Sequence, residues 1–248
     1  MLLNDKVALV TGAGTGIGEA IARRFAAEGA RVYLFDRDAD GNRRVAESIG
    51  AAGGWAEAVA GDVTRAADLA ALVETARSRF GRIDILVNNA GIFPRQRFLE
   101  ITDEHWDEMQ NVNLKSTFRA SQLALKVMSE AGSGKIVNIS SVTFFLGVAN
   151  LAHYTASKGG VIGLTRSLAR AAGPFHVHVN CITPGFVQTE SEVRFVNEEE
   201  TRKMVGEQCL ERRITPLDVA RVCLFLACEL SDGMTGQCLN VDGGWVMH

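Results

Sequence analysis

Tyr154 and Lys158 are the two side chains of this sequence best suited to moving a proton. Residues four apart on a helix lie on one face, and residues 154–172 have the pattern of a helix. An unperturbed tyrosine hydroxyl titrates at ~10 and is a poor base at neutral pH. A nearby ammonium group stabilises the phenolate and lowers this pKa, so that the hydroxyl can exchange a proton with a substrate oxygen. Because the spacing alone is common by chance, its meaning depends on what else the chain supplies.

Residues 7–18 have the composition of a phosphate-binding turn. A short apolar strand runs into a glycine cluster, and the alanine-rich segment 19–28 follows as a helix. Glycines permit backbone angles that other residues resist, and they let N–H groups approach a phosphate at the helix start. The dinucleotide fingerprint Gly-x-Gly-x-x-Gly does not fit, because its last glycine would fall on Ile17. We expect a pyrophosphate site, with a simple turn as the alternative, on the pattern Thr11-Gly12-x-x-x-Gly16-x-Gly18.

A carboxylate at the end of the next predicted strand indicates which dinucleotide binds. Asp36 ends the segment 31–36 and lies 18 residues beyond Gly18. This is close to the ~20-residue offset at which an acidic side chain accepts hydrogen bonds from the adenosine ribose of NAD. The same charge would repel the 2′-phosphate of NADP, so NAD is predicted. Arg37 argues the other way, since a guanidinium could hold that phosphate, and Asp36 could instead cap the next helix.

The rest of the chain alternates strands with helices, which predicts right-handed crossovers and a single α/β domain over residues 1–248. Its doubly wound parallel sheet should have about seven strands and helices on both faces. Asp62 and Val63 follow a strand, so they are candidates to touch the adenine, although Asp62 could equally be a cap. Thr64 is expected to cap the helix 65–80. The expected strands are 7–10, 31–36, 55–59, 83–87, 134–141, 177–182 and 236–241, and the other helices are 38–51, 102–130 and one from 216 onward.

The composition argues against several classes of function. The 248 residues carry a net charge of −3 and are 47% hydrophobic, so no attraction to nucleic acid or anionic membrane is expected. The N-terminus has no secretory pattern and no apolar run approaches the ~20 residues of a membrane span, so a cytoplasmic protein is expected. The five cysteines are odd in number and contain no Cys-x-x-Cys. They are predicted to be buried thiols, and no metal site is expected.

These motifs together resemble those of the short-chain dehydrogenase/reductase family, in the branch built on Tyr-x-x-x-Lys. The resemblance covers essentially the whole chain and implies a Rossmann-type fold. The motifs that carry it are Thr11-Gly12-Ala13-Gly14-Thr15-Gly16-Ile17-Gly18, Asp62-Val63, Asn88-Asn89-Ala90-Gly91, Asn113, Ser141, Tyr154-Thr155-Ala156-Ser157-Lys158 and Pro184-Gly185.

The resemblance implies a role for each catalytic residue. Tyr154 would be the general acid in reduction and the base in oxidation. Lys158 would bind the nicotinamide ribose and depress the tyrosine pKa, and Asn113 would hold a water that links Lys158 to solvent. Ser140 and Ser141 are expected to point to opposite faces of a strand, and the family spacing selects Ser141 to bind the substrate oxygen. The expected cofactor contacts are Gly12, Thr15, Gly16, Ile17, Gly18, Asp36, Asp62, Val63, Asn89, Ala90, Gly91, Tyr154, Lys158, Pro184, Gly185, Val187 and Thr189.

We predict an NAD-dependent oxidoreductase that interconverts a secondary alcohol and a ketone in a small-molecule substrate. One alternative is a 3-oxoacyl-[acyl-carrier-protein] reductase that uses NADPH, since its motifs are nearly the same. Another is a regulator that binds NAD without catalysis, although such proteins typically lose the proton-transfer residues that this chain keeps. A mobile flap around residues 189–213 is expected to cover a substrate pocket walled by Phe144, Phe145, Val148, Leu151 and Phe186.

The resemblance also implies a homotetramer or a homodimer. Small residues on the helical segments 113–130 and 154–172 would suit close helix pairing between subunits or packing within one chain. These residues are Ala120, Ala124, Ala156, Gly159, Gly160 and Gly163.

Overall fold

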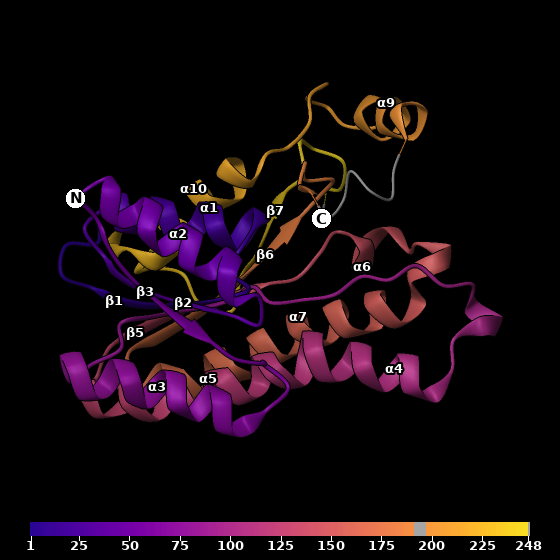
Figure 1. Cartoon of the computed structure of the whole chain (residues 1–248). Coiled ribbons are helices and arrows are strands. Elements are labelled where there is room, and N and C mark those ends of the chain that lie inside the picture. Colours follow the sequence, from indigo (N-terminus) through magenta and orange to yellow (C-terminus); the bar gives the residue numbers. More distant parts are fainter. Residues whose placement is uncertain (191–196, 248) are drawn as a thin grey trace.

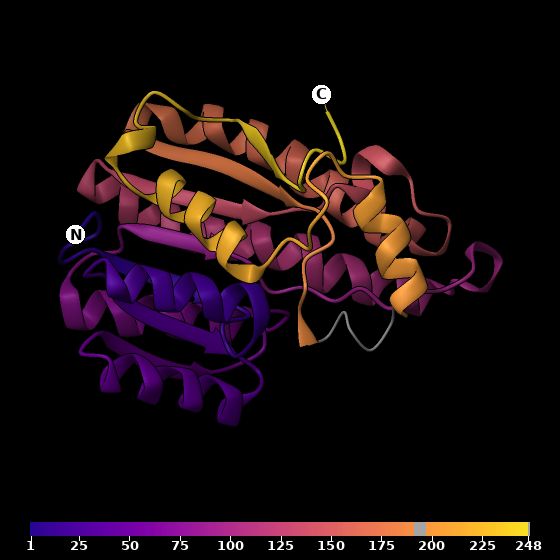
Figure 2. The same cartoon turned by 90° about the horizontal axis from the view of Figure 1, so that it is seen from above.

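A computed structural model of the chain has one seven-stranded sheet covered by helices on both faces (Figures 1 and 2). The structure describes residues 1–190 and 197–247. The strand order is β3-β2-β1-β4-β5-β6-β7, and every neighbouring pair is parallel. This confirms the predicted doubly wound α/β fold. The strands are β1 (Val7–Thr11), β2 (Arg31–Asp36), β3 (Trp55–Ala60), β4 (Ile85–Asn88), β5 (Gly134–Ile139), β6 (Val177–Pro184) and β7 (Cys238–Val241).

The helices form a layer on each side of the sheet (Figure 1). One layer consists of α1 (Gly16–Ala27), α2 (Ala39–Ala51) and α10 (Pro216–Ala227). The other contains α3 (Ala66–Phe80), α5 (Ser116–Ala131) and α7 (Ala152–Ala172). The shorter helices are α4 (Asp103–Gln110), α6 (Thr143–Leu146) and α9 (Glu198–Gly206). None of the helices in the described part of the chain is both long and apolar enough to span a bilayer.

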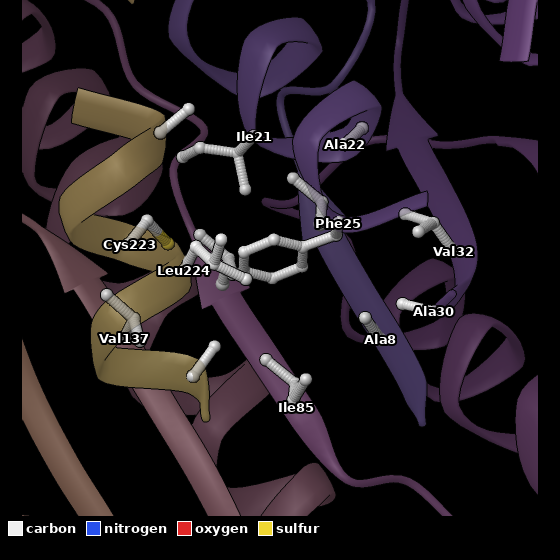
Figure 3. Packing of buried hydrophobic residues seen from close by; sticks show 14 of the residues in the cluster. Ala8, Ile21, Ala22, Phe25, Ala30, Val32, Ile85, Val137, Cys223 and Leu224 are labelled. Carbon is white, nitrogen blue, oxygen red and sulfur yellow. The ribbon is translucent and has the colours of Figure 1, made fainter. Parts of the chain in front are cut away.

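Alternating side chains of the strands build a separate core on each face. Ala8 and Val10 of β1 belong to the core under α1 and α10, whereas Val7 and Leu9 belong to the core under α3, α5 and α7. Figure 3 shows the first core, where the Phe25 ring of α1 extends toward Leu224 of α10. Burial on both faces explains the nearly continuous apolar runs of the strands and makes the sheet a rigid support for the loops at its ends.

One local prediction was wrong, and one predicted helix is irregular. The predicted helix 102–130 is helical from Asp103 onward, but a π-helical turn, Asn111–Lys115, lies between α4 and α5. Thr64 does not cap α3, which begins at Ala66, since its hydroxyl donates to the Asp62 carboxylate at 2.8 Å.

Candidate active site

The carboxyl ends of the strands open into one cleft with a volume of about 1110 Å³. The chain proceeds from β1 to β3 toward one edge of the sheet and from β4 to β7 toward the other edge. The loops after β1 and β4 therefore lead away from each other and leave a crevice between them. Each strand from β1 to β6 contributes a residue at or just beyond its end to the cleft wall. These residues are Gly12, Asp36, Gly61, Asn89, Ser141 and Pro184.

The loop after β1 presents the N-terminus of α1 to the cleft. Thr15, Gly16 and Ile17 line the cleft, and Thr15 at the N-cap makes no side-chain hydrogen bond to the first turn. The first N–H groups of a helix have no acceptor within it, so this end can bind an anion such as a pyrophosphate. Gly18 does not line the cleft. A Cβ there would lie 1.9 Å from the Gly12 carbonyl oxygen, so Gly18 allows the helix to pack on the strand end.

Asp36 lies at one end of the cleft and holds the glycine loop. One carboxylate oxygen accepts from the Gly14 N–H at 2.9 Å, and the other accepts from the Asp38 N–H at 3.0 Å. Each oxygen keeps a further lone pair that could accept from a ribose hydroxyl. Arg37 also lines the cleft, as does Arg44 of α2, which the sequence analysis missed. The Arg44 guanidinium donates to the Gly14 carbonyl at 3.1 Å, and no motif distinguishes it from the other basic residues of α2.

Asp62 and Val63 both line the cleft, and Asp62 also closes the turn after β3. Its carboxylate accepts from the backbone N–H and from the hydroxyl of Thr64, each at 2.8 Å. These hydrogen bonds, with the Arg37 and Arg65 charges, hold the pKa of Asp62 below its ordinary value. The two roles left open by the sequence are therefore compatible.

Asn89, Ala90 and Gly91 line the cleft after β4, and the side chain of Asn89 fixes the glycine loop. Its amide donates to the carbonyl oxygens of Thr11 and Gly12 at 3.0 and 2.9 Å. In return, the Thr11 hydroxyl accepts from the N–H groups of Asn89 and Ala90 at 3.0 and 3.1 Å. The loops on both sides of the crevice are thus held together by polar contacts.

Tyr154 and Lys158 lie on the same face of α7 and both line the cleft. The Lys158 Nζ atom is 5.7 Å from the centre of the Tyr154 ring, and it donates to the Ile139 carbonyl at 2.9 Å. The lysine is 4% exposed, and burial lowers its pKa to about 8. Burial raises the pKa of Tyr154 to about 12, against a smaller lowering by a hydrogen bond with Ser141. The expected lowering of the tyrosine pKa is therefore absent in the protein alone, because the effect of burial outweighs that of the hydrogen bond with Ser141.

Ser141 and Ser140 have different partners just beyond the end of β5. The Ser141 side chain hydrogen-bonds Tyr154 and accepts from the Thr143 N–H at 3.2 Å. The Ser140 hydroxyl donates to the Lys158 carbonyl at 2.7 Å and so anchors α7 to the sheet. Of the two, Ser141 is the serine whose hydroxyl is next to Tyr154.

Asn113 does not line the cleft, and its side chain is buried in the π-helical turn. Its amide exchanges hydrogen bonds with the backbone of Ile92, at 2.8 and 2.9 Å, and donates to the Ser157 hydroxyl at 3.1 Å. A Cβ on Gly91 would lie 3.2 Å from Asn113 Oδ1 and 3.4 Å from Lys158 Nζ. The asparagine and the lysine therefore approach each other around Gly91.

The predicted substrate wall is only partly correct. Leu151 and Phe186 line the cleft, whereas Phe144, Phe145 and Val148 do not. Phe144 lies over α7, where a Cβ on Gly159 would be 2.6 Å from its ring, and Phe145 packs on the buried cluster around Val161. A further part of the cleft wall follows the Asn89–Gly91 motif and continues into α4 and the π-helical turn, and it was not predicted from the sequence. It comprises Ile92, Phe93, Arg95, Glu108, Asn111 and Val112, together with Thr143 of α6. The Phe93 ring packs edge-on against Tyr154, with centroids 6.4 Å apart.

The segment after β6 crosses to the glycine loop. Pro184, Gly185, Val187 and Thr189 line the cleft, and a Cβ on Gly16 would lie 3.4 Å from the Thr189 methyl group. Of the predicted flap, residues 191–196 lie outside the described residues, and the part beyond them contains α9.

The small residues that were expected to suit helix pairing lie partly in the core and partly on the surface. Ala120 and Ala124 lie in the core, while Phe144 and Leu114 of the same chain lie over Gly159 and Gly160. Ala156 and Gly163 are exposed.

Comparison with known proteins finds relatives that match nearly the whole chain. The family model described as "Enoyl-(Acyl carrier protein) reductase" matches residues 12–246. A probable galactose dehydrogenase of Rhizobium meliloti is 38% identical over 98% of this chain and 95% of its own length. The 3-oxoacyl-[acyl-carrier-protein] reductase FabG of Salmonella typhimurium is 34% identical over the full length of both chains.

A solved structure is similar over nearly the whole fold. It is a 7α-hydroxysteroid dehydrogenase complexed with NADH and 7-oxo glycochenodeoxycholic acid, with a TM-score of 0.96 and 35% identity. The match covers 99% of this chain and 96% of that one. These relatives define a class of oxidoreductases that act on CH–OH groups, and the solved neighbour contains a nicotinamide dinucleotide. The chain belongs to the short-chain dehydrogenase/reductase family.

Proposed function

We propose that this enzyme uses NAD to interconvert a secondary alcohol and a ketone, with Tyr154 as the acid and base. The observation that carries the proposal is the meeting of Tyr154, Lys158 and Ser141 in the cleft that also holds Asp36 and the start of α1. When bound, the nicotinamide would accept or donate the hydride. The loop after β1, Asp36 and the residues 89–91 would hold the dinucleotide.

Side chains of the site would transfer the proton to or from the substrate oxygen. Ser141 would donate a hydrogen bond to the substrate oxygen and keep it close to the tyrosine hydroxyl. In reduction, that oxygen becomes an alkoxide, a stronger base than a phenolate, so Tyr154 can give up its proton despite a pKa of about 12. In oxidation, Tyr154 must first be deprotonated. The rate of oxidation should therefore increase with pH more steeply than the rate of reduction.

Asp36 supports NAD over NADP, since its carboxylate would lie where a 2′-phosphate would have to bind. The second candidate, an NADPH-dependent acyl-carrier-protein reductase, draws support from Arg37 and Arg44 at the same end of the cleft. It is also supported by the likeness to FabG. Other relatives are named for galactose, D-xylose and a hydroxysteroid, so a small hydroxylated substrate fits the family. A tenfold preference for NADPH in kcat/KM, ~1.4 kcal/mol in free energy, would favour the second candidate.

Replacing Tyr154 with phenylalanine tests the acid and base role. The variant should bind NAD as wild type does, while its kcat for a ketone or alcohol substrate falls by roughly 10²–10⁴-fold. Binding is followed by quenching of tryptophan fluorescence, and turnover by absorbance at ~340 nm, where the reduced nicotinamide absorbs. Normal binding with undiminished turnover would exclude this tyrosine as the acid and base. Normal binding without turnover in wild type, over a panel of alcohols, sugars and acyl thioesters, would favour a non-catalytic NAD-binding protein.

We also propose a homotetramer or homodimer assembled through the outer faces of α5 and α7. An apolar groove of about 340 Å³ runs between these helices, lined by residues that include Phe118, Leu164 and Phe175. Phe118 and Phe175 are 46% and 43% exposed in the single chain, and an interface would cover them. Light scattering of the purified enzyme would measure the assembly. The five free thiols fit a reducing compartment, which supports a cytoplasmic location.

A mobile flap over the substrate is part of the same proposal. Thr189 and Glu190 line the cleft, and α9 follows further along the chain. Cleavage within 189–213 by a trace of protease should slow when both cofactor and a substrate analogue are bound.

A further inference from the structure

Two cysteines lie side by side beneath the helix that carries the proposed acid and base. The register of β6 and β7 places Cys181 directly opposite Cys238. Their side chains share a hydrogen bond, and both are free thiols. Neither has a part in the proposed oxidoreductase chemistry.

The surroundings of the two thiols differ. Cys181 is fully buried and packs with Val161 and Ile162 of α7, and the charge of Lys158 acts on it from one turn earlier in the helix. Cys238 is partly exposed, and its sulfur lies 3.9 Å from the Thr183 hydroxyl. An oxidant from solution would therefore reach Cys238 first.

The spacing of the strands permits a bond between the two sulfurs. Neighbouring strands lie ~4.8 Å apart, and disulfides join Cα atoms separated by about 4.4–6.8 Å. The hydrogen bond from Cys181 lowers the pKa of Cys238 to about 7, which increases the fraction of reactive thiolate at neutral pH. Cys223 has the opposite environment, because burial raises the pKa of its thiol well above the ordinary value.

We propose that Cys181 and Cys238 form a reversible redox site in which a peroxide converts the two thiols to a disulfide. The Cys238 sulfur attacks one peroxide oxygen, which breaks the O–O bond, releases one water from hydrogen peroxide and leaves a sulfenic acid. The Cys181 sulfur then attacks the sulfenic sulfur, which forms the S–S bond and releases a second water. The two thiols lose two electrons and two protons, and the peroxide is reduced to two waters. A dithiol reductant reverses the change.

Peptide mapping tests the proposal without any assay of the enzyme's activity. The variant Cys209→Ser removes an exposed thiol that could link two chains. After treatment with hydrogen peroxide, remaining thiols are alkylated in denaturant and the chain is cut after basic and acidic residues. Cuts after Glu229 and Asp232 separate Cys238 from Cys223 and Cys228. We expect a linked pair of peptides containing Cys181 and Cys238 that disappears with dithiothreitol, while Cys223 and Cys228 are alkylated.

The double variant Cys209→Ser/Cys238→Ser, treated in the same way, is the matched control. It should give no linked peptide that contains Cys181. If this double variant does not fold, peptide mapping of the oxidised Cys209→Ser variant alone still decides the question. The proposal is overturned if Cys181 is still fully alkylated after Cys238 has been oxidised. It is also overturned if Cys181 is linked to a different cysteine.

Discussion

Replacing Lys158 with methionine measures what the buried ammonium costs the folded chain. Burial lowers the pKa of Lys158 from 10.5 to about 8. Each pKa unit corresponds to ~1.4 kcal/mol, so the protonated lysine costs the fold about 3 kcal/mol at pH 7. Methionine has a similar length and no charge, but it leaves the Ile139 carbonyl without its donor, at a cost of about 1 kcal/mol. Without cofactor, the variant should be more stable than wild type by about 2 kcal/mol.

The pH dependence of this difference identifies its cause. Below pH ~8, Lys158 is protonated in both the folded and unfolded states, and the full cost is present. Between about 8 and 10.5, the folded protein has lost a proton that the unfolded chain still holds, so wild-type stability rises by up to ~1.4 kcal/mol per pH unit relative to the variant. The raised pKa of Tyr154 affects stability in the opposite direction above its ordinary value of 10.0, but to first order it acts in both proteins and cancels in the difference.

Urea unfolding followed by tryptophan fluorescence, at one protomer concentration and from pH 7 to 10, provides the measurement. The variant's advantage should shrink as the pH rises and reverse at about pH 9.5. Lys203→Met, at an exposed position of α9, is the control and should show no such trend. A difference for Lys158→Met that stays constant over this range would show that burial does not desolvate the ammonium.

Three further changes test other parts of the site and the fold. Asp36→Ala should lower the preference for NAD over NADP in kcat/KM by about tenfold or more, because the carboxylate that repels a 2′-phosphate is removed. Asp40→Ala, which removes an exposed carboxylate from the first turn of α2, should leave the ratio unchanged. An unchanged ratio in Asp36→Ala would refute the role assigned to Asp36. Gly91→Ala should reduce kcat by roughly tenfold to a hundredfold with normal circular dichroism, since the new methyl group would lie 3.2 Å from Asn113 Oδ1 and 3.4 Å from Lys158 Nζ. Wild-type turnover in that variant would show that this contact can relax. Gly50→Ala should stabilise the chain by about 0.5–1 kcal/mol in the urea assay, because Gly50 lies near the end of α2, is exposed, and a Cβ there meets nothing within 4 Å. A loss of stability would show that the helix needs a glycine at this position.

The fold and the position of the cleft could be predicted because their signals are local in the sequence. Apolar runs such as residues 31–36 read directly as buried parallel strands, and the strand ends must meet at one edge of the sheet. Tyr154 and Lys158 share a face by helix periodicity alone. Motif spacing then indicated which serine lies near them, and the contacts of Ser141 agree with that choice.

The remaining features depend on contacts between distant segments. Phe144 is apolar and close in sequence to Tyr154, yet its ring lies over Gly159 and stays outside the cleft. Arg44 reaches the cleft because the Gly14 carbonyl and Glu19 hold its guanidinium, and no local pattern encodes that arrangement. The pKa of Tyr154 could not be predicted from the sequence for the same reason. A lysine four residues away suggests a lowered pKa, but the sequence does not show how strongly burial raises it.

The polar contacts of the site explain how one helix can place its side chains accurately. Ser140 binds the Lys158 carbonyl, and Lys158 binds the Ile139 carbonyl, so the end of β5 and the start of α7 are fixed to each other at two points. Asn113 fixes the loop after β4 to the same helix through Ser157. In this rigid frame, burial raises the pKa of Tyr154 and lowers that of Lys158, and both shifts disfavour charge. A positive charge brought next to the phenol would reverse the first shift. Binding of oxidised NAD should therefore release a proton from the enzyme near pH 8, detectable with a pH indicator dye in weak buffer, and Tyr154→Phe should release less.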